Sequence, residues 1–396
     1  MQILSGWAKA DVWGSPDAIP AFLGDRADGT PVSEIWFGAH PDGPTLLADG
    51  RTLAQFIEED PARALGPDLL YAFGPTLPFL LKIIAPDQTL SLQVHPTKEI
   101  AREGYLREEV LGVARTDRRR TYRDMNHKPE MIYAITDFEA LVGFRVPRKA
   151  RRLLEGLECD LAARLRHRLQ LSTVRGGLQA LVAWLFDEDS PATAAAVTEF
   201  VEECRVRLAE GRSPSRRADR LVDVLGARHP GDPGIIVAFL MNPVSLRPGE
   251  AVHIPPRQIH AYQSGLGIEV MASSDNVIRA GLTGKYVDSA QLVEIAEFSA
   301  LPPVRVAPEH PTPTTDRFMV PAQEFELAVT TLSGDEAEVE VPGEGARILL
   351  TVEGRARVRT RDGEAVLDRG EAAFVAADEG VVKARGNGRL IQVGAP

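Results

Sequence analysis

The 396-residue sequence predicts a mainly β protein with an inserted helical domain. Residues 1–147 and 233–396 contain short apolar runs bounded by Gly- and Pro-containing turns, which is the pattern of strands. Residues 148–232 instead carry apolar side chains at helical spacing, with charged residues on the other face. These observations predict a β-sandwich interrupted by helices and followed by further strands.

An internal repeat indicates that there are two related β-sandwiches. The segment "LRPGEAVHIPP", from Leu246, resembles "LDRGEAAFVAA", from Leu367. In both, a polar turn leads into a strand whose alternate residues point inward. Because His253 of the first copy corresponds to Phe374 of the second, and His260 to Val381, only the first carries polar inward residues. We therefore expect the second sandwich to be structural.

The elements follow in order along the chain. Five apolar runs before residue 148 are expected to be strands: "EIWFGAH", "PFLLKIIA", "TLSLQVH", "EMIYAI" and "ALVGFRV". Helices are expected around residues 53–65 and 97–110, and then over 147–170 and 190–212. Breakers between His229 and Gly234 end the helical part. Strands resume with "IIVAFLMN", "VSLRPGEAVHIPP", "IHAYQSG" and "GIEVMAS", a Pro-rich linker is expected over residues 301–316, and strands fill the remainder.

We accordingly divide the chain into a first domain, an insertion and a second sandwich. The first domain comprises residues 1–147 and 233–302, the helical insertion residues 148–232, and the second sandwich residues 303–396.

Composition excludes several classes of partner. The formal net charge of −11 and the aromatic content of 6% argue against nucleic acid or an anionic membrane as a partner. Cys159 and Cys204 belong to no CxxC motif, which fits a reducing compartment. The start "MQILSGWAKADVWGS" lacks the pattern of a signal peptide, and no apolar run reaches about 18 residues. We expect a cytoplasmic monomer without membrane contact.

Polar side chains occupy alternate positions of one buried stretch, "SLQVHPTKEIA". In a strand, Ser91, Gln93 and His95 share one face, while Leu92 and Val94 share the other. Taken alone, this pattern also fits a strand with one solvated face.

Two further segments supply groups that suit a metal ion. "NHKPEMIYAI" places His127, Lys128 and Glu130 at the start of an apolar strand, where a buried carboxylate needs a partner. "HIPPRQIHAYQSG" adds His260 and Tyr262 after a rigid Pro-Pro corner. One amide oxygen, two imidazoles and one carboxylate would come from Gln93, His95, Glu130 and His260. Such a set suits zinc and leaves the site with a net positive charge.

Other charged positions admit two readings each. "SSDNVIRAGLTGKYVD" carries Asp275, Arg279 and Lys285 in a Gly-containing segment, either as functional groups or as a solvated loop. Lys82, in "FLLKII", is either a substrate ligand or a paired, snorkelling lysine. The run "RTDRRRTYRD", residues 115–124, is either a mobile loop beside the site or a solvated surface, and we favour the surface.

The motifs together resemble the type I mannose-6-phosphate isomerases, zinc enzymes of the cupin superfamily. The resemblance spans nearly the whole chain and includes "DVWGS", "EIWFGAHP", "LPFLLKIIAPDQTLSLQVHP", "NHKPEM", "PGEAVHIPPRQIHAY" and "SDNVIRAGLTGKYVD". It implies a jelly-roll catalytic domain and one zinc per chain, with the ligands falling on Gln93, His95, Glu130 and His260. The family's catalytic arginine falls on Arg279.

The resemblance also implies the reaction, in which mannose 6-phosphate and fructose 6-phosphate interconvert through an enediol. Four residues are candidates for the general base: Glu269, Asp275, His127 and Lys128. The sugar phosphate is expected to contact Ser91, Lys82, Tyr262, Lys285 and His127, with Lys128 and Arg279 as further cations for the phosphate.

Two other functions remain open at this stage. An iron-dependent cupin oxygenase is disfavoured by the Gln ligand and the nearby Lys and Arg residues. A sugar-phosphate sensor that has kept the fold would be favoured by loss of a metal ligand or of Arg279, and all of these residues are present.

Overall fold

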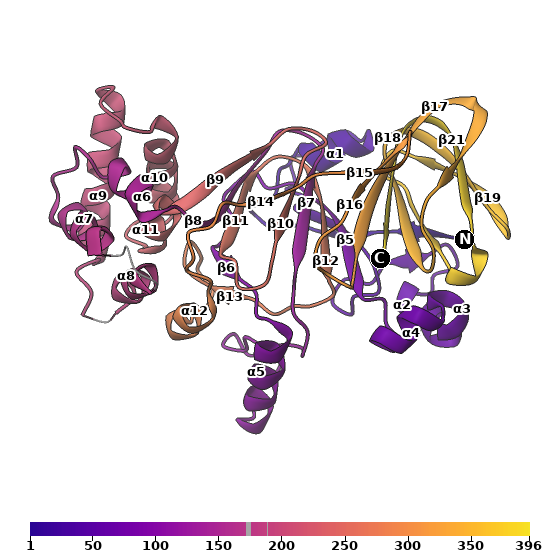
Figure 1. Ribbon diagram of the computed structural model, residues 1–396, viewed down its shortest axis with the longest axis horizontal. Coiled ribbons are helices and arrows are strands. Elements are labelled where there is room, and N and C mark those ends of the chain that lie inside the picture. The colour runs from indigo at the N-terminus through magenta and orange to yellow at the C-terminus, as the bar shows by residue number, and fades with distance from the viewer. Residues whose placement is uncertain (172–175, 188) are drawn as a thin grey trace.

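The computed structural model describes residues 1–171, 176–187 and 189–396. Three sheets form two β domains, and a bundle of helices lies at one end of the elongated molecule (Figure 1). The central β domain lies between this bundle and the C-terminal β domain, and the N-terminus lies beside the C-terminal domain (Figure 1). A mainly β fold with inserted helices, as predicted from the sequence, is confirmed.

The central domain is a sandwich of two antiparallel sheets. The larger sheet has seven strands in the order β14 (Val304–Val306), β10 (Ala251–Ile254), β7 (Glu130–Ala134), β12 (Gly267–Ala272), β5 (Phe79–Ile84), β3 (Glu34–Phe37), β2 (Trp7–Lys9). The smaller sheet has five strands in the order β13 (Ile278–Arg279), β6 (Gln93–Val94), β11 (His260–Ser264), β8 (Phe138–Phe144), β9 (Met241–Leu246).

Six further helices of the described residues lie outside the bundle. They are α1 (Ala18–Leu23), α2 (Leu53–Glu59), α3 (Pro61–Leu65), α4 (Pro67–Phe73), α5 (Lys98–Val110) and α12 (Ser289–Ile295). Of these, α2, α3 and α4 lie below the C-terminal domain (Figure 1). The helix expected over residues 53–65 is divided in two, because Asp60 ends α2 and caps α3, whose first residue is Pro61. Helix α5 begins at the Thr97 cap, close to its expected start.

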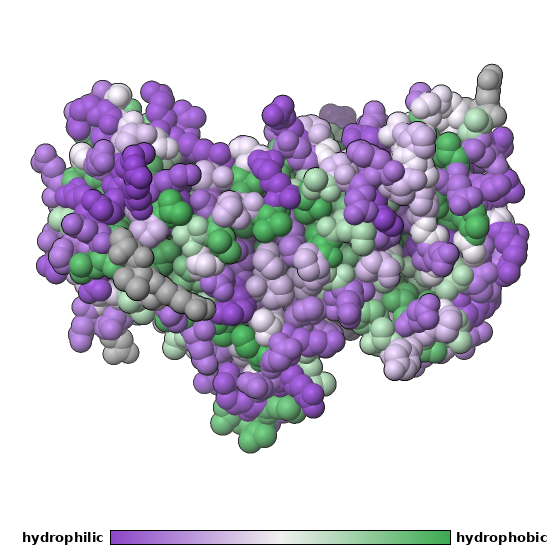
Figure 2. All heavy atoms as spheres, in the orientation of Figure 1, coloured by the Kyte–Doolittle hydropathy of each residue, from purple (hydrophilic) through white to green (hydrophobic). Residues whose placement is uncertain are grey.

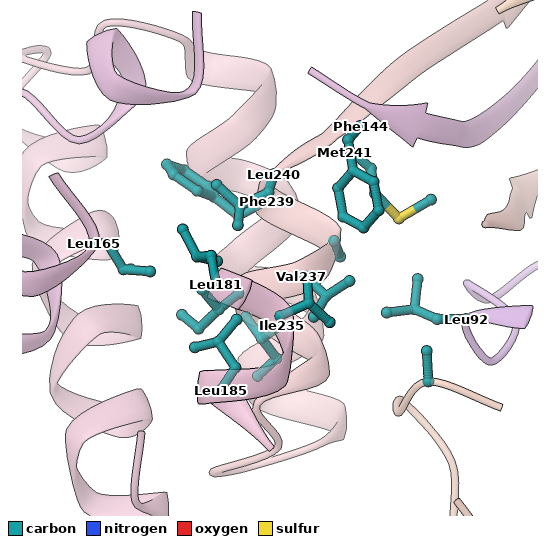
Figure 3. Close-up of a cluster of buried hydrophobic side chains, with 14 of the residues drawn as sticks. Leu92, Phe144, Leu165, Leu181, Leu185, Ile235, Val237, Phe239, Leu240 and Met241 are labelled. Atoms are coloured by element: carbon teal, nitrogen blue, oxygen red, sulfur yellow. The ribbon is translucent and has the colours of Figure 1, made fainter. Parts of the chain in front are cut away.

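The inserted bundle is built on a core that it shares with the smaller sheet. Its helices are α6 (Pro147–Leu153), α7 (Asp160–Leu171), α8 (Gly177–Leu185), α9 (Ala194–Ala209), α10 (Arg216–Arg228) and α11 (Gly234–Phe239). Leu181 and Leu185 of α8 lie beside Ile235 of α11, and Val237 of α11 lies on the side that faces Met241 and Leu92 (Figure 3). The apolar face of the stretch around β6 is therefore held by the bundle, which leaves its polar face to the interior of the sandwich.

The C-terminal domain contains a sheet of nine strands that includes strands from the chain's beginning. The order is β15 (Glu309–Thr312), β16 (Thr315–Phe318), β17 (Glu326–Val341), β21 (Val382–Gly394), β18 (Arg347–Thr360), β20 (Ala372–Val375), β1 (Gln2–Ser5), β4 (Leu46–Leu47), with β19 (Gly363–Asp368) on β18. A short 3-10 helix, η1 (Ala377–Glu379), follows β20. Thus β1 and β4 leave the first domain, and β14 of the last segment joins the larger central sheet.

The two copies of the repeat form the same turn. Gly249 and Gly370 both have φ of 89°, a conformation that favours glycine. In each turn the carboxylate of the glutamate after the glycine accepts a hydrogen bond from the backbone N–H three residues earlier. Glu250 accepts from Arg247, and Glu371 accepts from Asp368. The repeat inferred from the amino-acid sequence is therefore also a repeat of turn geometry.

Two sequence-based element predictions are wrong. "IIVAFLMN" is not a strand from its start, because residues 234–239 form α11, which is buried on every side in the bundle core. Its β-branched residues favour strands locally, but packing decides between helix and strand for a short apolar run. The Pro-rich segment 301–316 is not a linker, since it contains β14, β15 and the start of β16.

Candidate active site

The site is built where β6 lies between β11 and β13 in the smaller sheet. Gln93 pairs with His260 of β11 on one side and with Arg279 of β13 on the other. Directly opposed residues in a sheet project to the same face, so these three side chains line one surface. The Gln93 amide nitrogen donates to Ser91 Oγ at 3.1 Å, which leaves the Gln93 carbonyl oxygen free for another partner.

Glu130 is the centre of the polar cluster between the two sheets. Its carboxylate oxygens lie 3.2 Å from His95 Nε2, 3.2 Å from His260 Nε2 and 3.0 Å from Lys128 Nζ. The Tyr262 hydroxyl donates to Glu130 Oε2 at 3.1 Å. Burial would raise the pKa of Glu130, but the charge of Lys128 and the interactions with His95 and His260 hold that pKa well below its ordinary value.

Both imidazoles are oriented so that Nε2 faces the cluster. The Nδ1 of His95 lies 2.7 Å from the Asn276 carbonyl, and the Nδ1 of His260 lies 3.0 Å from the Gln258 carbonyl. Because a carbonyl only accepts, Nδ1 carries the proton in each neutral ring and Nε2 carries a lone pair. Burial and the charge of Lys128 lower the pKa of His95 to about 4, so this ring is neutral at physiological pH.

This donor set fits a zinc ion. His95 Nε2 is buried and has no hydrogen-bond partner among the described residues. Ligand atoms of His95, Glu130 and His260 all lie within 4.8 Å of one another, and Gln93 lies opposite His260. Two lone pairs that face a carboxylate at 3.2 Å need a cation between them, and nitrogen and oxygen donors are those zinc takes.

A second row of functional side chains crosses the larger sheet. Trp7, Trp36, Lys82 and Glu269 are paired in register on four neighbouring strands, so their side chains share one face. Lys82 Nζ lies 2.8 Å from Glu269 and 4.8 Å from the centre of the Trp36 ring. Burial lowers the pKa of Lys82, but the charges of Glu269 and Glu34 outweigh this effect and raise it.

Glu34 completes this row and was not singled out from the sequence. Its carboxylate accepts from Lys9 Nζ at 3.2 Å and from the Trp36 indole N–H at 3.2 Å, and it lies 3.6 Å from Lys82. The only sequence signal is its place at the start of the apolar run "EIWFGAH", where a buried carboxylate needs a cation. Lys82 is thus paired rather than free, as one of its two readings required.

Cations without acidic partners gather beside Gln93. Burial and the charge of Arg123 lower the pKa of Arg279, and burial together with the charges of Arg279, Lys9 and Arg123 lowers the pKa of Lys285. Among the described residues, neither Arg279 nor Lys285 forms an ion pair, although Asp11 lies near enough to act on the Lys285 charge. Arg123, which sequence reasoning missed, belongs to the Arg-rich run 115–124. This surface favours an anion.

Some predicted site residues are engaged elsewhere. The His127 ring lies 2.7 Å from Glu324 of the C-terminal domain. Asp275 lies 3.3 Å from His40 and 3.3 Å from Arg115. Burial alone would raise the pKa of Asp275, but the hydrogen bond and charge of His40 lower this pKa.

Two expectations are corrected here. His253 does not point inward: Val252 and Ile254 face the sandwich interior, so His253 faces the C-terminal domain by the two-residue period. The Arg-rich run is not simply a solvated surface, because Arg120 is buried against Glu108 and Glu109.

The fold and the site define a class of protein. A jelly-roll sandwich with a candidate metal site between its sheets, repeated as a second β domain without such a site in its described residues, is typical of a bicupin metalloprotein. The anion-binding surface beside the metal ligands indicates a small anionic substrate.

Comparison with known proteins identifies the family. Residues 1–147 match the family model of the phosphomannose isomerase type I catalytic domain, and residues 314–394 match that of the mannose-6-phosphate isomerase cupin domain. The chain is 34% identical over 400 residues to mannose-6-phosphate isomerase of Salmonella typhimurium, covering 99% of both chains. It is 32% identical to mannose-6-phosphate isomerase 1 of Arabidopsis thaliana, covering 88% of this chain and 81% of that one.

Solved structures agree with the sequences. A crystal structure of mannose 6-phosphate isomerase with zinc and yttrium superimposes with a TM-score of 0.90 at 32% identity, covering 100% of this chain and 99% of the other. The Salmonella typhimurium enzyme bound to fructose 6-phosphate and zinc gives 0.89 at 33% identity, with the same coverage. The chain therefore belongs to the type I mannose-6-phosphate isomerase family, as the sequence motifs predicted.

Proposed function

We propose that this protein interconverts mannose 6-phosphate and fructose 6-phosphate and that it binds one zinc ion through Gln93, His95, Glu130 and His260. The observation that carries the proposal is Nε2 of His95, which is buried without a hydrogen-bond partner among the described residues and faces Glu130 together with Nε2 of His260. The bound zinc would polarise a sugar oxygen as a Lewis acid.

Glu269 is the general base that the arrangement supports best. All four candidates have ion-pair partners: Lys128 is paired with Glu130, His127 with Glu324, Asp275 with His40 and Glu269 with Lys82. Among these four, only Glu269 is a carboxylate paired with a lysine, whose ammonium can stabilise a developing enediolate oxygen. Glu269 is buried beside Lys82 at 2.8 Å, on the same sheet face as Trp36. In this proposal Glu269 takes the proton from C2 of the open-chain aldose and returns it to C1, and the hydroxyl proton of O2 passes to O1. The Lys82 ammonium stabilises the developing enediolate oxygen.

Arg279 and Lys285 are the cations best suited to hold the phosphate. The charges of Lys82 and Lys128 are already matched by carboxylates, whereas Arg279 and Lys285 have no ion-pair partner in the described part of the chain. A guanidinium binds phosphate in bidentate fashion and an ammonium binds it as a point charge. Ser91 and Tyr262 remain proposed as hydroxyl contacts to the sugar.

A coupled assay tests this function. Conversion of mannose 6-phosphate to fructose 6-phosphate is measured on the purified protein, after chelation, and after zinc is returned. We expect activity to be lost on chelation and restored by zinc. A folded, zinc-loaded protein without turnover would contradict the isomerase and favour a sugar-phosphate sensor.

Two expectations about the cell and the assembly stay predictions. No helix in the described residues is long and apolar enough to cross a membrane. Sedimentation would test the expected monomer, and fractionation the expected cytoplasmic location.

A further inference from the structure

A cavity of about 360 Å³ lies outside the metal site, between the central and C-terminal domains. Its walls come from α2, α4, the first residue of α5, the end of β12 and Glu324 of the C-terminal domain. In Figure 1, α4 and α5 lie on the same lower side of the molecule, below β5 and β12. The volume is within the range of about 300–1,000 Å³ typical of small-molecule sites.

Glu324 gives this cavity a hydrogen-bonding group with spare capacity. The residue is 7% exposed, and its carboxylate pairs with His127 through Oε1 at 2.7 Å. Its second oxygen, Oε2, is buried without a partner among the described residues. Because Glu324 lines the cavity, a small movement of its side chain would let Oε2 accept a donor from a ligand there while Oε1 keeps His127. An unpartnered buried carboxylate oxygen is costly, and a ligand hydroxyl would satisfy it.

The other lining groups narrow the chemistry of the ligand. The lining includes one cation, Lys98, and one anion, Glu324. Asn126 and Ser273 add neutral hydrogen-bonding groups. An anion would meet Glu324 and a cation would meet Lys98, so the walls favour an uncharged molecule. Phe73 and Leu77 provide an apolar wall, which suits the C–H face of a sugar ring.

Hydrogen bonds connect the cavity lining to a proposed metal ligand through Asn126 and Asn276. The Asn126 carbonyl accepts from the Asn276 side chain at 2.8 Å, and the Asn276 carbonyl lies 2.7 Å from Nδ1 of His95. The two sites therefore share a wall, but the residues that line the cavity include none of the proposed zinc ligands.

We propose that this cavity is a second binding site, which takes an uncharged polyol of monosaccharide size and is distinct from the isomerase site. The probe is D-mannose, titrated calorimetrically into the full chain both zinc-loaded and zinc-free. We expect saturable binding that differs less than twofold between the two forms, because no metal ligand lines the cavity.

Two variants place the ligand. Ala72→Trp fills the cavity from an exposed position of α4, and Glu324→Gln removes the charged acceptor. Each is expected to weaken D-mannose binding about tenfold, as loss of space or of a hydrogen bond to a charged group predicts. Glu326→Gln is the matched control, because Glu326 is also buried but does not line the cavity, and it should change binding less than twofold.

The proposal is overturned by either of two results. One is no saturable binding of D-mannose to the wild-type chain. The other is binding that either Ala72→Trp or Glu324→Gln leaves intact, which would place the sugar elsewhere. Isomerase activity is assayed in parallel with mannose 6-phosphate on the wild-type chain, so failure of this proposal and failure of the isomerase are read separately.

Discussion

Lys285 illustrates how the charge of a single residue serves the site. Burial and the charges of Arg279, Lys9 and Arg123 lower its pKa from 10.5. Without a bound phosphate, Lys285 therefore loses its proton at a lower pH than an exposed lysine does. Phosphate binding favours the ammonium. KM for mannose 6-phosphate should therefore rise with pH at values below 10.5, whereas a Lys285→Arg variant should show no such rise. The measurement is KM against pH, with kcat as the internal control.

The alanine variant separates binding from chemistry. Lys285→Ala should raise KM about tenfold with little change in kcat, because the residue is proposed to hold the phosphate and not the reacting carbons. An equal loss in kcat would instead place Lys285 at the chemistry. Exposed Lys149→Ala, in the helical insertion, should change neither value.

At the residue scale, the alternation of polar and apolar residues along strands predicted several site residues, but it did not always predict which face of the sheet a side chain lies on. Gln93 and His95 were found because polar residues alternate with Leu92 and Val94, and those two are fully buried. Glu34 was missed because one carboxylate at the start of an apolar run has no local mark. The side of the sheet that His253 faces depends on register with β7, which the sequence does not contain.

At the element scale, the repeated turns allow a matched pair of substitutions. Gly249→Ala should cost about 1–2 kcal/mol through its positive φ alone, because an added Cβ there meets nothing closer than 3.9 Å. Gly370→Ala should cost more, since its Cβ would lie 2.3 Å from Leu23 Cδ2. Urea unfolding measures both, and Gly284→Ala, in open space without a positive φ, is the control. Equal costs would contradict the steric difference.

The row Lys9–Glu34–Lys82 across β2, β3 and β5 predicts a pH-dependent contribution to stability. Burial would raise the pKa of Glu34, but Lys82 and Lys9 hold it below 4.5. A carboxylate with a depressed folded-state pKa stabilises the fold above its unfolded pKa, and this contribution is lost as pH falls through the folded value. Glu34→Gln should therefore cost about 2 kcal/mol at pH 7 and progressively less below pH 4.5. Urea unfolding at pH 7 and pH 4 tests this, and a cost independent of pH would refute it.

Strands and helices differed in how well the sequence predicted them. Helix α5 has a Thr cap and charged residues along its length, so local signals sufficed. Helix α11 has neither a side-chain cap nor a polar face, and its conformation depends on the bundle around it. Strands β14 and β15 are short and lie at sheet edges; prolines precede β14 and one lies within β15, which makes this segment hard to distinguish from a linker in the sequence.

At the scale of the whole molecule, one hydrophobic core joins the central and C-terminal domains. It contains Leu4 and Phe37 from the beginning of the chain together with Phe325, Ile348 and Phe374 from its end. Strands β1 and β4 extend the C-terminal sheet, and β14 extends the central one. Sequence composition marks neither exchange: β1 and its partner β20 are more than 360 residues apart, and β14 follows its partner β10 by about 50 residues and lies in a segment that reads as a linker.

A shared core predicts that the two β domains unfold together. Phe325→Ala removes a fully buried ring of the C-terminal domain and should destabilise the protein by about 3–5 kcal/mol. In a Trp184→Phe background, the remaining tryptophans, at positions 7, 13 and 36, report only on the first domain. Their fluorescence transition in urea should move to lower concentration together with the far-UV circular dichroism, while exposed Val381→Ala should move neither. If the fluorescence midpoint does not change while part of the circular dichroism signal is lost at lower urea concentration, the two domains unfold independently. The C-terminal domain would then be dispensable for the stability of the metal site.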